Sequence, residues 1–215
     1  MNRIPNLCAL LLMLLWAEPG SAASAMQVSA GQLVTVGNFS SDFVPSRNIL
    51  VWLPDGYAEG AAAGRRDAVL YMHDGDSLFD AATTWNQQEW GVDEVLSRLL
   101  GEGAVRDVIV VGIPNAGPER AIEYLPQKPF EAMAEADREA LTGYVHPQLG
   151  RIYNGAVRSD AYLRFLVEEL KPYVDEHYAT LTDRDNTFVM GSSMGGLISI
   201  YALARYPDTF GGAGC

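Results

Sequence analysis

Short apolar runs alternate along the chain with stretches in which apolar residues recur every three or four positions. The runs that predict β-strands are Gln32–Val36, Asn48–Leu53, Ala68–Met72, Val108–Gly112 and Thr187–Met190, and one more strand is expected to begin within Phe210–Cys215. Ala68–Met72 is apolar throughout, which is typical of a strand buried on both faces. Strands that alternate with helices predict an α/β fold, with a mostly parallel central sheet covered by helices on both faces.

Three segments have the apolar spacing of helices. Val92–Leu100 and Leu197–Tyr206 are two of them. The third begins near Ser159 and Asp160, which can cap it, and Pro172 should kink or restart it. Its buried stripe is expected to consist of Leu163, Leu166, Leu170 and Val174.

The region between residues 114 and 158 is less regular. Prolines and glycines interrupt any long element there, among them Pro114, Gly117, Pro118, Pro126, Pro129, Pro147 and Gly150. The chain has 215 residues, which suits one domain. We therefore interpret this region as an excursion over the sheet and not as a second domain.

The first 25 residues have the pattern of a secretory signal peptide. Arg3 supplies a positive charge, Leu7–Trp16 is a ten-residue apolar run, and small residues precede Ala25. A ten-residue helix spans only about 15 Å, too short for a bilayer core of about 30 Å. We expect cleavage near Ala25, a single domain over residues 26–215, and a secreted or periplasmic protein with no membrane association after cleavage.

Composition narrows the classes of partner and cofactor. Acidic residues outnumber basic ones by 27 to 15, for a formal net charge of −12, which disfavours nucleic acid. Cys8 lies in the expected leader and Cys215 is the last residue, so no internal disulfide is expected. No metal-binding or nucleotide-binding motif is apparent, and we expect no cofactor.

The strongest chemical signal is the sequence Gly191-Ser192-Ser193-Met194-Gly195, which fits G-x-S-x-G. In this motif a strand turns sharply into a helix, and the central serine is held in a strained conformation with its hydroxyl exposed. An apolar strand is predicted before it and an apolar helix after it, as the motif requires. Ser193 is therefore the candidate nucleophile, and the N–H of Met194 is a candidate oxyanion donor.

Several motifs, in the same order, resemble the putative esterase family of α/β-hydrolases, which includes esterase D, enterochelin esterase-like and feruloyl esterase-like proteins. The matching segments are Arg47–Tyr57, Tyr71–Asp80 (YMHDGDSLFD), Gln88–Asp93, Arg120–Pro126 and the turn Ser192–Gly196. The resemblance spans about residues 32–215. It implies an α/β-hydrolase fold, an esterase activity and a small-molecule ester as substrate.

The resemblance also implies roles for individual residues. Ser193 would accept the acyl group, and the second oxyanion N–H would come from the loop after Ala68–Met72, near Asp76. The residues expected near the acyl or alcohol pocket are His73, Trp85, Trp90 and Tyr124.

One part of the family pattern does not fit. In this fold the triad acid and histidine follow the serine, but the residues after Ser193 contain no histidine. The three histidines, His73, His146 and His177, all precede it. We therefore expect the chain to lack the last strands of the fold, with the acid and histidine beyond residue 215; the alternative is a truncated, inactive protein of hydrolase fold.

The segment after Ala68–Met72 also permits two weaker functional interpretations. Gly75-Asp76-Ser77-Leu78 spells the GDSL block of another serine hydrolase family, whose other blocks are absent. Asp74 and Asp76 also imitate the D-x-D of Mg²⁺-dependent aspartyl-phosphate phosphatases, in which Asp74 would be the nucleophile.

Overall fold

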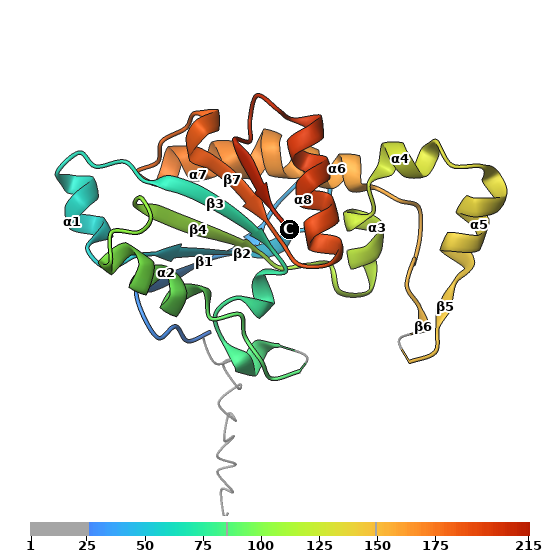
Figure 1. Cartoon of the computed structure of the whole chain (residues 1–215), viewed down its shortest axis with the longest axis horizontal. Coiled ribbons are helices and arrows are strands. Elements are labelled where there is room, and N and C mark those ends of the chain that lie inside the picture. The colour runs from blue at the N-terminus through green and yellow to red at the C-terminus, as the bar shows by residue number, and fades with distance from the viewer. Residues whose placement is uncertain (1–25, 85, 149) are drawn as a thin grey trace, which may run out of the picture.

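The computed structural model describes residues 26–84, 86–148 and 150–215, so the expected leader and Trp85 lie outside the described residues. Six strands form the central sheet in the order β1-β2-β4-β3-β7-β8 (Figure 1). Their bounds are β1 Gln32–Phe39, β2 Arg47–Leu53, β3 Ala68–His73, β4 Val108–Ile113, β7 Thr187–Met190 and β8 Gly212–Gly214. Each predicted apolar run is a strand of this sheet.

Strand direction changes across the sheet. β2 pairs antiparallel with both β1 and β4. β3 pairs parallel with β4 and with β7, and β8 is parallel to β7. The predicted, mostly parallel α/β sheet is therefore confirmed, with an antiparallel edge that the apolar runs alone did not reveal.

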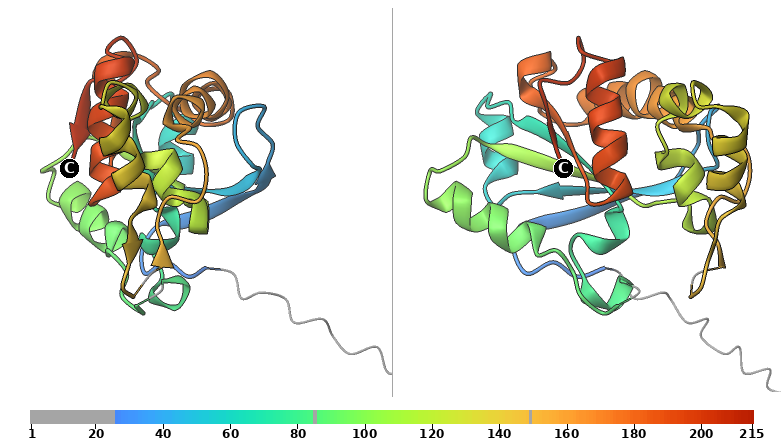
Figure 2. Two further views of the ribbon diagram at one scale, coloured as in Figure 1. Left: turned by 90° about the vertical axis from the view of Figure 1, so that its right-hand side faces the viewer. Right: turned by 45° about the vertical axis from the view of Figure 1, so that its right-hand side comes forward.

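Helices cover both faces of the sheet (Figures 1 and 2). The helical elements are α1 Tyr57–Ala62, α2 Val92–Gly101, α3 Arg120–Tyr124, α4 Gln127–Glu131, α5 Glu135–Gly143, α6 Ser159–Arg164, α7 Lys171–His177 and α8 Met194–Arg205, with short turns η1 Gly75–Ser77, η2 Ala81–Thr83, η3 Gly117–Glu119 and η5 Arg184–Asn186. One apolar core contains side chains of α6, α7 and α8, and a second contains those of α2. No helix in the described part of the chain is long and apolar enough to cross a bilayer.

The helix predicted around Leu163 runs from α6 through α7. All four residues of its predicted stripe are fully buried. A π-helical segment, η4 Phe165–Leu170, lies directly before Pro172, where proline removes a backbone donor and crowds the preceding turn. The predicted capping is wrong, because Arg158 is the N-cap residue. Ser159 Oγ instead accepts a hydrogen bond from Gln127 N at 2.9 Å.

The excursion between β4 and α6 contains more structure than its prolines predict. It holds η3, α3, α4, α5 and a two-stranded hairpin, β5 Val145–His146 and β6 Gly150–Arg151. α3 contacts α6 and α8, whereas α5 and the hairpin project beyond the end of the sheet (Figure 1). The excursion therefore lies mostly beside the sheet and not over it.

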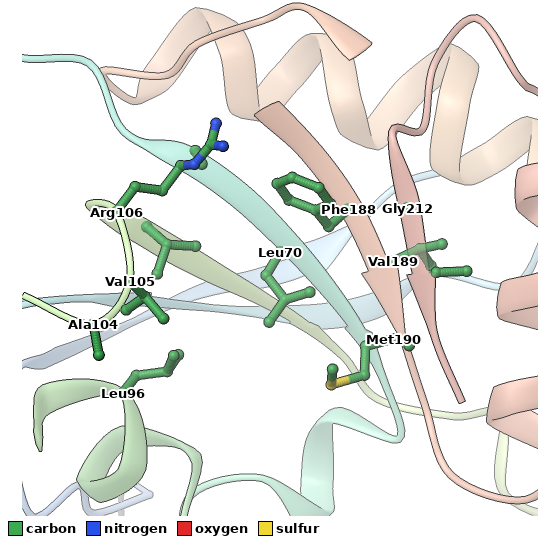
Figure 3. Close-up of a pocket in the computed structure, with 13 residues that line it drawn as sticks. Leu70, Leu96, Ala104, Val105, Arg106, Phe188, Val189, Met190 and Gly212 are labelled. Carbon is green, nitrogen blue, oxygen red and sulfur yellow. The ribbon is translucent and has the colours of Figure 1, made fainter. Parts of the chain in front are cut away.

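The face that α2 covers stays open over β3, β7 and β8. An apolar hollow of about 530 Å³ lies there, lined by Leu70, Leu96, Val105, Phe188 and Met190 among others (Figure 3). Met190 is 38% exposed, although it belongs to an interior strand of the sheet.

A buried ion pair ties the excursion to the antiparallel edge. The carboxylate of Glu123 on α3 is fully buried and accepts two hydrogen bonds of 2.9 Å from Arg47, at the start of β2. Arg158 donates a third at 3.2 Å. A buried carboxylate needs such partners because its desolvation is costly.

Removing Arg47 should therefore destabilise the protein strongly. We expect Arg47→Met to lower the free energy of unfolding by about 3–5 kcal/mol, because it leaves a buried charge short of its main partner. Urea unfolding measures this loss. Arg98→Met is the matched control, since Arg98 and Glu102 are both more than half exposed, and it should cost about 0.5 kcal/mol or less. Equal losses in the two variants would contradict the prediction.

Candidate functional site

Ser193 lies at the turn between β7 and α8. Its backbone has φ 57° and ψ −118°, a conformation that non-glycine residues rarely adopt, and its side chain is exposed. Such strain costs about 1–3 kcal/mol and persists only where the surroundings enforce it. The chain therefore holds this serine at the apex of a sharp strand-to-helix turn.

Two glycines make this turn sterically feasible. A Cβ on Gly191 would lie 2.6 Å from the carbonyl carbon of Gly195, which is closer than real Cβ contacts. The helix therefore begins at Met194, three residues earlier than the apolar spacing predicts. Met194 N–H belongs to the first turn of α8, whose N–H groups have no acceptor within the helix.

The loop after β3 packs against this turn. Asp74 has φ 57° and ψ 48°, and a Cβ on Gly195 would lie 3.2 Å from its Oδ2. A Cβ on Gly75 would lie 2.7–2.8 Å from backbone atoms at the end of β4, so this position also requires glycine. Because β3 lies between β4 and β7 in parallel, the carboxyl ends of all three strands meet at one edge.

Arg120 holds the loop from the side of the excursion. Its Nε and Nη2 donate to the two carboxylate oxygens of Asp74 at 2.6 and 2.7 Å. Asn115 Nδ2 donates to the same carboxylate at 2.9 Å. Asp74 N donates to the hydroxyl of Tyr124 at 3.3 Å. A bidentate pair of this kind fixes orientation as well as position.

A cavity of about 740 Å³ lies over these elements. Its lining is polar, and the lining residues come from the serine turn, the loop after β3, the segment before α2 and the excursion. The lining residues are Asp74, Asp76, Ser77, Thr83, Thr84, Asn86, Gln88, Trp90, Asn115, Arg120, Ser192 and Ser193. The structure therefore brings Ser193 and Asp76, predicted from distant motifs, to one cavity.

Burial raises the pKa of the Asp76 carboxyl, and the nearby charge of Asp74 raises it further. The backbone N–H groups of Asp76 and Asn115 act against this shift, since they stabilise the charged form. A raised pKa favours the neutral carboxyl, which repels a developing negative charge less than a carboxylate does.

Two residues expected in the pocket lie below it. His73 and Tyr124 are fully buried and are not among the lining residues; with Tyr162 they form a cluster whose ring centroids are 5.3–5.6 Å apart. Of the expected pocket residues, Trp90 lines the cavity and is 39% exposed. An aromatic residue next to a motif packs into the core as readily as into a pocket, and sequence does not separate the two cases.

None of the three histidines is among the residues that line the cavity. His73 Nδ1 lies 2.8 Å from the hydroxyl of Tyr162, and burial lowers the pKa of His73 to about 4, so the ring is neutral at neutral pH. His177 Nδ1 lies 2.8 Å from the carbonyl of Tyr173, at the end of α7.

The phosphatase reading gains no support from this geometry. Both carboxylate oxygens of Asp74 are engaged by Arg120 and are not free to attack a phosphoryl group. Within residues 26–84, 86–148 and 150–215, no group of three or more histidine, cysteine or acidic side chains could hold a metal ion.

Sequence reasoning did not identify the pairing of Arg120 with Asp74, nor the polar residues Thr83, Thr84, Asn86 and Gln88 of the cavity wall. In the sequence, Arg120 stands out only as part of the family-like segment Arg120–Pro126. Its partner lies 46 residues earlier, and no local pattern links the two.

Comparison with known proteins places the fold and the site in context. The family described as "Putative esterase" matches residues 40–215. The chain belongs to this family. The YbbA protein of Bacillus subtilis, itself uncharacterised, is 26% identical over 179 residues, which cover 83% of this chain and 59% of YbbA. The chain thus spans 56–59% of the length of its curated relatives YbbA and YjcH.

Solved structures show the same α/β-hydrolase fold. The ferulic acid esterase of Anaeromyces mucronatus, solved with ferulic acid, is 25% identical with a TM-score of 0.53, over 89% of this chain and 58% of that one. The siderophore hydrolase EstA of Aspergillus nidulans is 22% identical with a TM-score of 0.58, over 88% and 59%.

The buried histidine should make stability depend on pH. The unfolded chain binds a proton at His73 below about pH 6.5, whereas the folded protein binds it only below about pH 4. This contribution to stability is therefore complete above pH 6.5 and declines as the pH falls to 4, by up to about 3 kcal/mol. Urea unfolding across this range should show a shallower slope for His73→Phe, and identical slopes would contradict the prediction.

Proposed function

We propose that the protein is a serine carboxylic-ester hydrolase with Ser193 as its nucleophile. The observation that carries this proposal is the strained backbone of an exposed serine that lies next to a close glycine contact and lines a polar cavity. A serine without a catalytic role, placed in an ordinary turn, would not need to adopt such a strained backbone conformation.

In the proposed reaction, Ser193 Oγ attacks the ester carbonyl carbon and gives its proton to a general base. The carbonyl oxygen takes up the negative charge, and the N–H groups of Met194 and Asp76 donate to it. The base then protonates the leaving alcohol, which leaves an acyl group on Ser193. Water, deprotonated by the same base, releases the acid and restores the serine. The reaction uses no metal or organic cofactor.

We propose that the general base is a histidine that follows residue 215, oriented by an acid from the same region. Two facts support this placement. His73, His146 and His177 each have a ring nitrogen near a partner outside the cavity lining, namely Tyr162, Gln148 N and the carbonyl of Tyr173. The chain also spans only 56–59% of its curated relatives. The chain order of serine, acid and histidine in this fold agrees with it.

The substrate we propose is a small ester with polar groups near the scissile bond. The cavity of about 740 Å³ has the size of a small-molecule site and offers hydroxyl, amide and carboxyl groups. Two structurally similar proteins are a ferulic acid esterase and a siderophore hydrolase. This similarity supports a substrate that is an ester of a small acid or of a chelator.

A fluorophosphonate probe tests the nucleophile directly. The full-length protein should gain one adduct at Ser193, seen by intact mass and peptide mapping, and Ser193→Ala should gain none. Ser192→Ala is the matched control, and it should still form the adduct because its neighbour is unchanged. Absence of labelling in a folded full-length protein would instead favour an inactive protein of hydrolase fold.

We also propose that residues 1–25 are removed on export, to the periplasm or the medium. Apolar residues 7–16 and the small residues before Ala25 support this. The mature protein recovered from its natural host should begin near residue 26 by N-terminal sequencing. A mature protein that begins at residue 1 would contradict the proposal.

A further inference from the structure

Residues 26–31 lie against the segment that leads from β3 to α2. One backbone N–H group donates to that segment, Gln27 N to Asp80 Oδ2 at 2.9 Å. Two more donate to the first turn of α2, Ser29 N and Ala30 N to Asp93 Oδ2 at 2.7 and 3.2 Å. We call residues 26–31 the strap.

Apolar contacts hold the strap to the sheet as well. Met26 and Val28 pack against the core beneath α2, which includes Trp52, Leu78 and Phe79. Trp52 Nε1 donates to the carbonyl of Ala30 at 2.8 Å, so the indole ring fixes the far end of the strap. The strap is thus anchored independently of the cavity.

A short series of hydrogen bonds leads from the strap to Asp76. The carboxylate of Asp80 accepts two hydrogen bonds of 2.9 Å, one on Oδ2 from Gln27 N and one on Oδ1 from Ala82 N. The hydroxyl of Thr83, which has one proton to donate, lies between the carbonyls of Asp80 and Asp76, with Oγ1 at 2.8 and 2.7 Å from them. Thr83 and Asp76 both line the cavity that contains Ser193.

The segment around Asp76 has little regular structure of its own. Its described residues form only the single turns η1 and η2 and take no part in the sheet. Two backbone hydrogen bonds link its start to its end, Trp90 N to the carbonyl of Ser77 and Val92 N to that of Leu78. An oxyanion donor must lie 2.7–3.1 Å from the developing charge, so such a segment needs further support.

We infer that the strap positions the oxyanion donor Asp76, acting through Asp80 and Thr83 as positioning residues. This inference rests on the proposed function, in which Asp76 N–H receives negative charge in the transition state. The hydrogen bonds from Gln27 N and Ala82 N lower the pKa of the Asp80 carboxyl, since both stabilise its charged form.

The variant Gln27→Pro tests the strap, since proline removes the N–H that Asp80 accepts. With the full-length protein and 4-nitrophenyl acetate as probe, kcat should fall about tenfold while KM changes about twofold or less, because the loss acts in the transition state. Ser29→Ala is the matched control: it removes a hydroxyl that donates to Glu94 and leaves the bond to Asp80 in place. It should keep kcat within about twofold of the parent.

Thr83→Val tests the same path from the cavity side and keeps the test valid if the proline variant fails to fold. It should lower kcat about as much as Gln27→Pro, and Thr83→Ser should restore most of it, because the hydroxyl returns. The double variant should be no worse than either single variant, as expected for residues that act through one path. Additive losses, or a parental kcat in Gln27→Pro and Thr83→Val, would overturn the inference.

Ser193→Ala separates this inference from the proposed function. If it is inactive while both strap-path variants match the parent, only the strap inference fails. If it hydrolyses the ester at the parental rate, Ser193 is not the nucleophile and both fail.

Discussion

The close approach of β7 and α8 is the constraint on which the rest of the site depends. Gly191 lets the end of β7 and the first turn of α8 meet where a single methyl group would separate them. Ser193 lies between these two segments in its strained conformation, and it lines the cavity with Ser192. The energy stored in that strain is small beside the burial of the neighbouring strand and helix, so the packing can hold it.

Around this turn, most of the cavity wall is irregular chain held by charged side chains. Asp74 is fixed by Arg120, and Asp80, three residues before Thr83, accepts the N–H groups of Gln27 and Ala82. Hydrogen bonds to charged groups are stronger than neutral ones and are directional, which suits loops that have no sheet partners. Some of the carboxylates that give the chain its negative net charge therefore stabilise the structure of these loops.

The order of strands and helices could be predicted from the sequence because buried parallel strands require continuous apolar runs, as in Ala68–Met72. The start of α8 could not, since Gly195 and Gly196 weaken a helix locally and their close contacts, with Asp74 and with Gly191, arise only in the folded structure. Ser193 was identifiable from a local motif with a mechanical cause. The pairing of Asp74 with Arg120, and the burial of His73 and Tyr124, depend on the tertiary fold and leave no periodic trace.

The strand order has a consequence for the time course of folding. β3 pairs on one side with β4, which follows it closely, and on the other with β7, where Val69 lies opposite Thr187. Closing so long a loop is entropically costly, and sheets built from distant partners form slowly. During synthesis, β3 therefore emerges long before the strand that completes its pairing, and its apolar edge stays unprotected in the interval.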